Sequence, residues 1–505
     1  MSGKKTVFQS AMLLTAASLA LRAVSMVFQI YLSNVVGAAG IGLLQLTMSV
    51  GMLAMTAATL GVRVAAMYLS AEEYAHRRPG SGRLAIRCCI GYALILSVTV
   101  GAALFHFAPL LAVHWIQDGR AAGALQLFGL FLPVSVCWTI LDGYFTATGR
   151  IGRLVAVEVL ERLLSMALTI LMLRYWARSD TARACCAILF GSGAASLLSL
   201  LFLGTLYLRE QHQPCASGAG SMTWRLLRLA VPVGLNDILR SGLSTMEHLM
   251  IPRGLAQSGS DPEQAMAAYG TIHGMVFPVI LFPAAVLYAL SDLLVPELAG
   301  SIAQNHRRRI HHMTDKCLRI GLLFAVAIAG SLFVSARPLA QLLYHSEDAG
   351  FYLRIFAPLI LILYLDTIVD GMHKGLGQQI YCVRYNTFTS LLDVLLLFFL
   401  LPRFGIDGYF FAFTATHAVN FYLSLNRLLK VTGYIPSLQY VCKVLFCALA
   451  AAWLAQWLVP ETLVCALLYI MSFTFLIALL RVCSREDWRW LFATIQGKKT
   501  KVETR

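Results

Sequence analysis

Apolar stretches of about 20 residues or more recur along almost the whole chain, separated by short polar connections. A helix of that length crosses a hydrocarbon core of about 30 Å, and the stretches are too continuous for barrel strands. No connection is long enough for a soluble domain. The pattern predicts an all-α polytopic membrane protein with fourteen spans, at 7–33, 41–70, 84–109, 121–147, 151–175, 182–207, 224–251, 266–294, 317–336, 350–373, 380–402, 407–427, 438–458 and 461–480.

Three predicted spans carry a stripe of polar residues at helical spacing, and each stripe contains an arginine. The stripes are Thr15, Ser18, Arg22, Ser25, Gln29 and Ser33; Gln45, Ser49, Thr56, Thr59 and Arg63; and Asp237, Arg240, Ser241, Ser244 and His248. A charge at the bilayer centre costs about 2.5 to 3.5 kcal/mol on insertion scales, so these arginines need a partner or a function. Guanidinium forks match phosphate oxygens. We therefore expect the stripes to line one hydrated space that binds a diphosphate, with Gln29, Gln45 and Ser244 contributing.

Neutralisation by a nearby carboxylate is the alternative for each arginine. Arg162 follows Glu158 by four residues, the favourable spacing for a pair within one helix, although Arg162 is also a substrate-binding candidate. Arg240 follows Asp237 by three residues and stays ambiguous. Arg22 and Arg63 have no acidic residue within four positions, which leaves pairing from another helix as their alternative.

The distribution of charge predicts the topology of the chain. The net charge is +15, and most of the 40 Lys and Arg residues fall on the cytoplasmic side if the N-terminus is cytoplasmic. The protein is then expected in the bacterial cytoplasmic membrane, with both termini on the cytoplasmic side. No nucleic-acid partner is expected. Arg174, Arg178 and Arg183 depart from this pattern because they fall on the predicted outer side.

The sequence contains no GxxxxGK[ST] phosphate loop, so transport is not expected to use ATP directly. No cofactor is expected, and Na⁺ or H⁺ is the predicted coupling ion. Carboxylates inside predicted spans are its candidate sites, with Asp237 and Asp393 preferred. Asp370 can instead bond to backbone, and Asp237 can serve Arg240. The candidates are Asp237, Glu247, Asp366, Asp370 and Asp393.

A short internal repeat predicts the domain organisation. Thr139-Ile-Leu-Asp142-Gly143 with Gly149 recurs as Thr367-Ile-Val-Asp370-Gly371 with Gly377, at an offset of 228 residues. The two copies close the fourth and tenth predicted spans, so six spans separate them and the repeat is parallel. The predicted parts are a first lobe (1–210), a second lobe (211–435), two additional helices (436–482) and a basic cytoplasmic tail (483–505).

The residues around the repeat resemble those of a known family. Leu141 to Gly149, with Glu158 and Arg162 after it, is similar to the stage V sporulation protein B-like polysaccharide exporters. The similarity continues in order through Ile251-Pro-Arg-Gly-Leu255, Ala268-Tyr-Gly270, Phe282-Pro283, Leu294-Val-Pro-Glu297, Gly375-Leu-Gly377 and Leu401-Pro-Arg-Phe-Gly-Ile-Asp-Gly408. The resemblance implies the multidrug, oligosaccharidyl-lipid and polysaccharide exporter superfamily, with two six-helix lobes around a central cavity and transport by alternating access. Its lipid II flippase branch also has two extra C-terminal helices.

The function expected from these features is a flippase, not an enzyme, for a saccharide linked to undecaprenyl diphosphate. Peptidoglycan precursor is the cargo favoured by the resemblance, and a monomer in membrane lipid is plausible. A drug or organic-cation antiporter of the same fold is the main alternative, because carboxylates gather in the second half. A membrane-embedded glycosyl ligase and a scaffold for envelope assembly also stay open.

Overall fold

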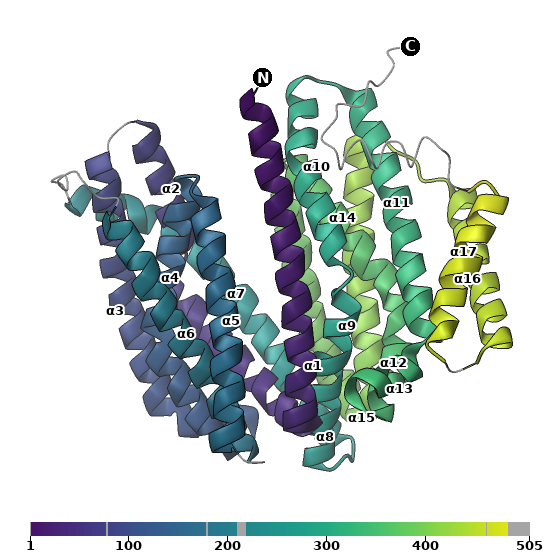
Figure 1. Cartoon of the computed structure of the whole chain (residues 1–505), viewed down its shortest axis with the longest axis horizontal. Coiled ribbons are helices and arrows are strands. Elements are labelled where there is room, and N and C mark those ends of the chain that lie inside the picture. Colours follow the sequence, from purple (N-terminus) through teal and green to yellow (C-terminus); the bar gives the residue numbers. More distant parts are fainter. Residues whose placement is uncertain (1, 77–78, 178–179, 210–218, 461, 483–505) are drawn as a thin grey trace. The chain divides into compact units, whose positions relative to one another are not determined.

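Helices form nearly all of the chain described by the computed structural model, which covers residues 2–76, 79–177, 180–209, 219–460 and 462–482. No strand occurs in these ranges. The α-helices are α1 (Ser2–Thr59), α2 (Val62–Ala75), α3 (Pro79–Leu111), α4 (Ala122–Ala147), α5 (Ile151–Met172), α6 (Thr181–Arg209), α7 (Ala219–Gln257), α8 (Pro262–Gly270), α9 (Phe277–Leu281), α10 (Ala285–Ala303), α11 (Arg307–Val334), α12 (Ala336–Tyr344), α13 (Glu347–Phe356), α14 (Ile360–Gly375), α15 (Gln379–Thr432), α16 (Leu438–Leu458) and α17 (Val464–Leu479) (Figure 1).

Ten helical stretches of the described chain are long and apolar enough to cross a membrane, and α17 is a shorter apolar helix. The prediction of an all-α polytopic membrane protein is confirmed. Two predicted boundaries, at 33–41 and 402–407, are confirmed, because α1 and α15 each consist of two helices that meet at a non-helical residue in these ranges. The kink lies at a glycine in both, Gly37 with φ 79° and Gly405 with φ 56°. Glycine adopts these positive φ angles without the steric cost that a Cβ imposes.

The span predicted at 266–294 is divided into three helices. A π-helical segment, Thr271–Val276, joins α8 to α9, and a break at residues 282–284 separates α9 from α10. Pro283 lies in this break, where its missing N–H and its ring prevent a continuous helix.

The chain forms two compact units. The α9–α17 unit comprises Met1–Val35, Gln257–Gly259 and Thr271–Arg505, and the α2–α7 unit comprises Val36–Ala256 and Ser260–Gly270. The first part of α1 therefore packs with the C-terminal helices, and α7 packs with the helices before it. The lobe boundaries at 210 and 435 stay a prediction, and the predicted tail at 483–505 lies outside the described residues.

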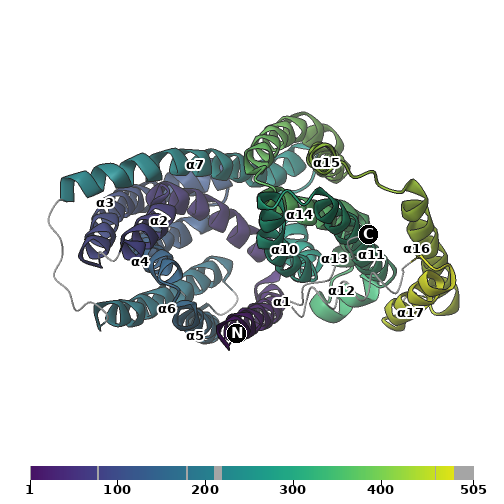
Figure 2. The ribbon, with the colours of Figure 1, turned by 90° about the horizontal axis from the view of Figure 1, so that it is seen from above.

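In the α2–α7 unit, α4 is the central helix. It contacts α2, α3, α5 and α6, and apolar residues of these helices form one buried core around Tyr144 and Phe145 (Figure 2). Gly143 allows a close approach to α2, because a Cβ there would lie 3.0 Å from the Arg63 carbonyl oxygen. This contact brings the end of α4 against the beginning of α2.

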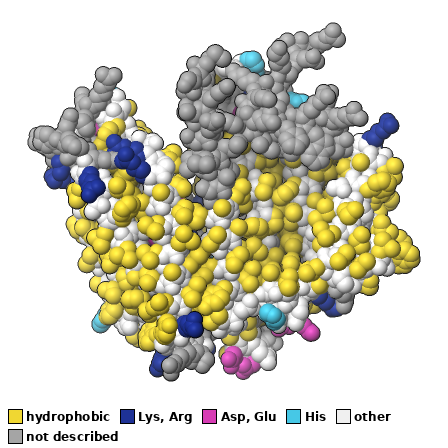
Figure 3. Space-filling view, in the orientation of Figure 1, with side chains coloured by type: hydrophobic (Ala, Val, Ile, Leu, Met, Phe, Trp, Pro, Cys, Tyr) yellow, Lys and Arg dark blue, Asp and Glu magenta, His cyan; other side chains and the backbone are white. Residues whose placement is uncertain are grey.

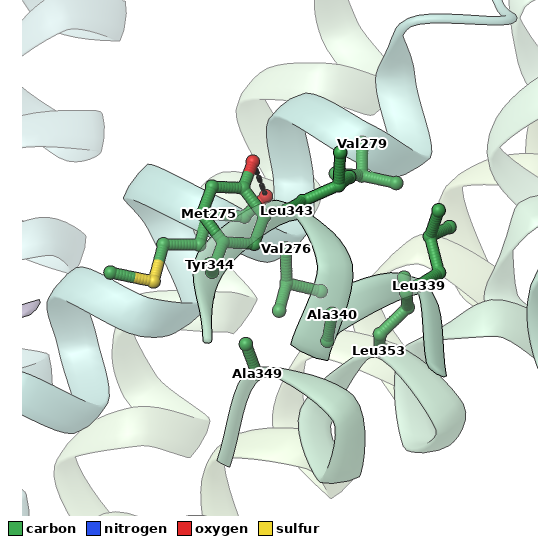
Figure 4. A pocket seen from close by; sticks show the side chains of 9 residues that line it. All are labelled: Met275, Val276, Val279, Leu339, Ala340, Leu343, Tyr344, Ala349 and Leu353. Atoms are coloured by element: carbon green, nitrogen blue, oxygen red, sulfur yellow. Dashed lines mark hydrogen bonds between the residues drawn. The ribbon is translucent and has the colours of Figure 1, made fainter. Parts of the chain in front are cut away.

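In the α9–α17 unit, α14 packs between α10, α11 and α15, and the α16–α17 hairpin lies beside α11 (Figure 2). The Tyr469 hydroxyl donates to the Val326 carbonyl at 3.0 Å and joins α17 to α11. The helices α12 and α13 pack on residues 271–281 through an apolar contact, in which the Tyr344 hydroxyl donates to the Met275 carbonyl at 3.1 Å (Figure 4). Two helices thus follow α15, as predicted for 436–482.

The turns after α4 and α14 have the same backbone conformation. Gly149 has φ 73° and Gly377 has φ 69°. In both turns the glycine N–H bonds to the carbonyl three residues earlier, and the next residue bonds to the carbonyl five residues earlier. This is the glycine-terminated cap expected where a helix ends in a left-handed residue.

The offset of 228 residues also holds far from the motif. Gln117 (φ 63°) and His345 (φ 53°) are both left-handed, and each precedes a residue whose side chain caps the next helix, Asp118 and Ser346. The repeat therefore describes backbone geometry as well as sequence.

The outer surface agrees with a membrane environment. Hydrophobic side chains cover the middle of the helices on the face shown in Figure 3, and Lys and Arg side chains lie toward helix ends. The structure describes a multi-pass membrane protein, while the cytoplasmic location of both termini stays a prediction. Of the three arginines that depart from the charge pattern, Arg178 lies outside the described residues.

Candidate functional site

Arg63 and Asp142 form an ion pair inside the α2–α7 unit. Arg63 lies at the beginning of α2, and its Nε donates to Asp142 Oδ2 at 2.7 Å. The Arg63 side chain is 56% exposed, whereas that of Asp142 is 7% exposed. Asp142 belongs to the repeat motif, and the neighbouring Gly143 permits the approach of α4 to α2 that makes this contact. The partner of Arg63 therefore comes from another helix, the alternative that the sequence left open.

The rest of the Arg63 guanidinium is available to a ligand. Within the described residues, no hydrogen bond involves its two Nη atoms. Thr146 Oγ1 donates to Asp142 Oδ1 at 3.4 Å, and Glu158 of α5 interacts electrostatically with Asp142 and Arg63. Asp142 thus fixes one edge of the guanidinium, and the other edge can bind an anion.

No ion pair within 4.0 Å joins Glu158 and Arg162 in the described chain, although the two side chains interact electrostatically, so their pairing stays a prediction. Arg162 is exposed on α5. Glu158 is half-buried, and the neighbouring Glu161 accepts a hydrogen bond from Ser196 at 2.5 Å.

The polar stripe of α7 lies in the same unit as Arg63. Arg240 and Ser244 are exposed, Asp237 is half-buried, and the described structure has no ion pair between Asp237 and Arg240. Thr245 Oγ1 donates to the Ser49 carbonyl at 3.1 Å and connects this stripe to that of residues 45–63. Gln45 and Glu247 are half-buried, and Glu247 interacts with Tyr269.

Both ends of α7 are attached to the α2–α7 unit. Arg225 pairs with Glu72 at 2.9 Å and with Glu73 at 2.8 Å. Near the other end, Arg253 donates to the carbonyls of His114 and Trp115. These contacts hold the α7 stripe in place from both sides of the span.

Arg22 and Gln29 lie in the α9–α17 unit. Arg22 is exposed, and its Cζ lies 5.3 Å from the ring centroid of Tyr288. Gln29 Nε2 donates to the Gly274 carbonyl at 2.9 Å, and Asn34 Nδ2 donates to the Leu343 carbonyl at 2.8 Å. Gln29 therefore anchors α1 to this unit, a structural role that the periodic pattern does not reveal.

A hydrogen-bonded network of carboxylates lies between α14 and α15. Asp393 is 6% exposed and accepts from Thr416 at 2.9 Å. Asp366 accepts from Asn420 Nδ2 at 3.0 Å, and Thr389 Oγ1 donates to Asn420 Oδ1 at 3.4 Å. The sequence predicts Asp393 as a coupling residue, but Thr416 and Asn420 are not among the predicted site residues. Their spacing of four residues, which places them on one helix face, is the signal that could have identified them.

Asp370 lies near this network and interacts with Asp366 and Cys382. Its repeat counterpart Asp142 pairs with Arg63, and the residue at the position equivalent to Arg63, 228 residues later, is Ser291. The aspartate of the first copy is thus paired with an arginine, whereas the equivalent position of the second copy holds a serine. No group of three or more His, Cys, Asp or Glu in the described chain is arranged to hold a metal ion.

Comparison with known families gives two matches. Residues 7–256 match the family described as polysaccharide biosynthesis protein, and residues 256–399 match the MatE family. The first match contains Arg63, Asp142 and the whole of the α2 to α6 bundle. The second contains the carboxylates of α14 and the first part of α15.

Two proteins of Bacillus subtilis (strain 168) are similar over most of this chain. Stage V sporulation protein B is 23% identical over 415 residues, which cover 80% of this chain and 80% of that protein. The uncharacterized membrane protein YabM is 22% identical over 443 residues, which cover 84% of this chain and 80% of that protein.

Solved transporter structures share the fold. The lipid II flippase MurJ in an inward closed conformation matches with a TM-score of 0.68 and 12% identity, over 96% of this chain and all (100%) of that chain. An inward-facing multidrug resistance MATE family transporter of the MOP superfamily matches with a TM-score of 0.64 and 14% identity, over 82% of this chain and 96% of that chain. At these identities the likeness concerns the fold alone.

Proposed function

Because this chain belongs to the stage V sporulation protein B-like polysaccharide exporters of the multidrug, oligosaccharidyl-lipid and polysaccharide exporter superfamily, we propose that it flips a lipid-linked saccharide. The chain is a transporter of this superfamily. The proposed cargo is a saccharide on undecaprenyl diphosphate, with peptidoglycan precursor favoured. The proposed direction is from the inner to the outer leaflet of a bacterial cytoplasmic membrane, with both termini inside.

The observation that carries the proposal is the half-exposed guanidinium of Arg63. Its Nε is held by buried Asp142, and its Nη edge has no partner in the described structure. An arginine fork binds phosphate oxygens through two parallel hydrogen bonds, and such bonds are stronger where water is scarce. Arg63 inside a membrane span is therefore suited to a diphosphate, while the polyprenyl tail of the cargo stays in lipid.

Arg22 and Arg240 are the further proposed contacts of the diphosphate. Both are exposed within predicted spans. Arg22 stacks on the ring of Tyr288, and this contact does not neutralise the charge of the guanidinium. Movement of the cargo needs no covalent step, because alternating access only changes the side to which the headgroup is exposed.

The network of α14 and α15 is the proposed coupling site for Na⁺ or H⁺. Asp366 accepts a hydrogen bond from Asn420 and Asp393 accepts one from Thr416, and carboxylates inside membrane spans are the usual carriers of proton or cation coupling. Asp237 on α7 and Asp370 are the other carboxylates proposed to take part.

A drug or organic-cation antiporter is the second candidate, favoured by the same buried carboxylates. It would bind cations at the acidic network, and Arg63 would then be dispensable for transport.

Reconstituted vesicles distinguish the two functions. Wild-type protein is expected to move a fluorescent saccharide-diphosphate-undecaprenyl lipid between leaflets, and Arg63→Ala and Arg22→Ala are expected to abolish this at normal protein level. Arg174→Ala, which removes an exposed arginine from the π-helical segment after α5 (Leu173–Ala177), is the matched control and is expected to keep the activity. Near-normal flipping by Arg63→Ala would refute the proposal, and uptake of an organic cation by that variant would support the antiporter.

A further inference from the structure

A cavity of about 240 Å³ lies where the end of α11 meets α12, α13 and α16. Its lining includes Phe333 of α11, Arg337 and Pro338 of α12, Arg354 of α13 and Gln456 of α16. All belong to the α9–α17 unit. The cavity therefore occupies the seam between the α16–α17 hairpin and the remainder of that unit.

The charged side chains of this cavity are both cationic. Arg337 and Arg354 line it, and none of its described lining residues is a carboxylate. The Cζ of Arg354 lies 5.0 Å from the ring centroid of Phe333, a cation–π contact that orients the guanidinium without neutralising it. Gln456 adds an amide that can donate further hydrogen bonds. Arg354 has no ion pair within the described residues, so its guanidinium gives the cavity the chemistry of an anion site, to which Arg337 adds a second cation.

The cavity lies at the ends of two membrane-spanning helices, where a helix of this length is expected to reach the lipid headgroups. The spans α11 and α16 end at Val334 and Leu458, next to its lining residues. On α16, Trp453 and Trp457 are 68% and 69% exposed and stack with their ring centroids 6.2 Å apart. Tryptophans that face lipid collect at the membrane interface, because the ring is apolar and its N–H is polar.

We propose that this cavity binds the phosphodiester headgroup of an anionic glycerophospholipid. The two arginines would hold its phosphate oxygens, since guanidinium groups are weakly hydrated and fit phosphate bidentately. Phe333, Pro338 and Pro460 provide apolar contacts for the glycerol and the beginning of the acyl chains. A lipid bound here connects α16 to α12 and α13, so it stabilises the hairpin on the unit. The proposal does not depend on which cargo the protein transports.

The test uses the full chain purified in a neutral detergent and measures bound lipid by native mass spectrometry. Wild-type protein is expected to retain phosphatidylglycerol and to gain thermal stability from it, but not from phosphatidylcholine or inorganic phosphate. Each guanidinium removed, by Arg337→Gln or Arg354→Gln, is expected to weaken retention by about tenfold or more. Arg403→Gln is the matched control, because Arg403 is exposed on α15 outside the cavity.

Equal retention of phosphatidylglycerol by Arg337→Gln/Arg354→Gln and wild type would overturn the proposal. Stabilisation by inorganic phosphate as large as that by phosphatidylglycerol would also overturn it, since the site would then be for a soluble anion. If the double variant unfolds, Gln456→Leu keeps both arginines and removes only the amide. It is expected to retain less phosphatidylglycerol than wild type, and unchanged retention would count against the site.

Discussion

Asp142 Oδ2 lies 2.7 Å from Arg63 Nε, and this contact joins a buried carboxylate of α4 to a half-exposed guanidinium of α2. The arrangement is unequal, because Asp142 is committed to the pair while the Nη edge of Arg63 can bind a second anion. It makes Asp142 a positioning residue in the proposed mechanism.

The variant Asp142→Asn is expected to weaken flipping by about tenfold, because it removes the charge that orients Arg63 and a charge-assisted hydrogen bond contributes about 1.5 to 3 kcal/mol. The check is the flipping rate against lipid concentration in vesicles. If Asp142 acts through Arg63, then Asp142→Asn will slow flipping less in an Arg63→Lys background, which keeps part of the activity, than in wild type. Additive losses in the double variant would show that Asp142 acts independently.

The close approach of α14 to α10 at the repeat glycine Gly371 can be tested by thermal unfolding in detergent. A Cβ at Gly371 would overlap Ser291 Oγ of α10, and overpacking of this kind costs about 1 to 3 kcal/mol. Gly371→Ala is therefore expected to lower the melting temperature. Gly371→Ala/Ser291→Ala should recover part of the loss because Oγ is removed. Gly300→Ala on α10 has nothing within 4 Å of the new Cβ and is the control.

Removing the charge of Asp393 is expected to uncouple transport from the ion gradient. In Asp393→Asn the hydrogen bond from Thr416 can persist, but the site can no longer bind a proton or cation by charge. Flipping should then become insensitive to imposed Na⁺ and H⁺ gradients, measured one at a time. Asp407→Asn, at an exposed position of the same helix α15, should keep the wild-type dependence. Full gradient dependence in Asp393→Asn would exclude that residue from coupling.

The segment between α15 and α16 is held by Tyr434, whose hydroxyl donates to Asp315 at 2.7 Å. Burial, and then the hydrogen bond to Asp315, raise the pKa of Tyr434 from 10.0 to about 12. Because the folded-state pKa is the higher one, this stabilisation is complete below pH 10 and is lost as the pH rises toward 12.

Tyr434→Phe is expected to cost about 1 kcal/mol at neutral pH, the usual value for one hydrogen bond. The difference in unfolding free energy between wild type and Tyr434→Phe should shrink between pH 10 and 12. A difference that stays constant over that range would contradict the assigned role of the hydroxyl.

The sequence alone determined the class of protein, the positions of nearly all spans and the family. Apolar length and helical periodicity are local properties, and the bilayer selects for them directly, so 121–147 and 438–458 could be predicted within a residue or two of α4 and α16. The sequence also predicted the repeat, because the turns that end α4 and α14 both favour glycine at their left-handed residue, 149 and 377.

Only the tertiary structure decided which side chains meet. Arg63 and Asp142 are 79 positions apart, and Asp366 and Asn420 are 54 apart. It also placed the first part of α1 with the C-terminal helices. In lipid the hydrophobic pattern orients no helix toward a chosen neighbour, so these contacts depend on close packing at small residues such as Gly143 and on pairing of polar groups. Such pairings belong to the folded arrangement of helices and leave no periodic signal along the chain.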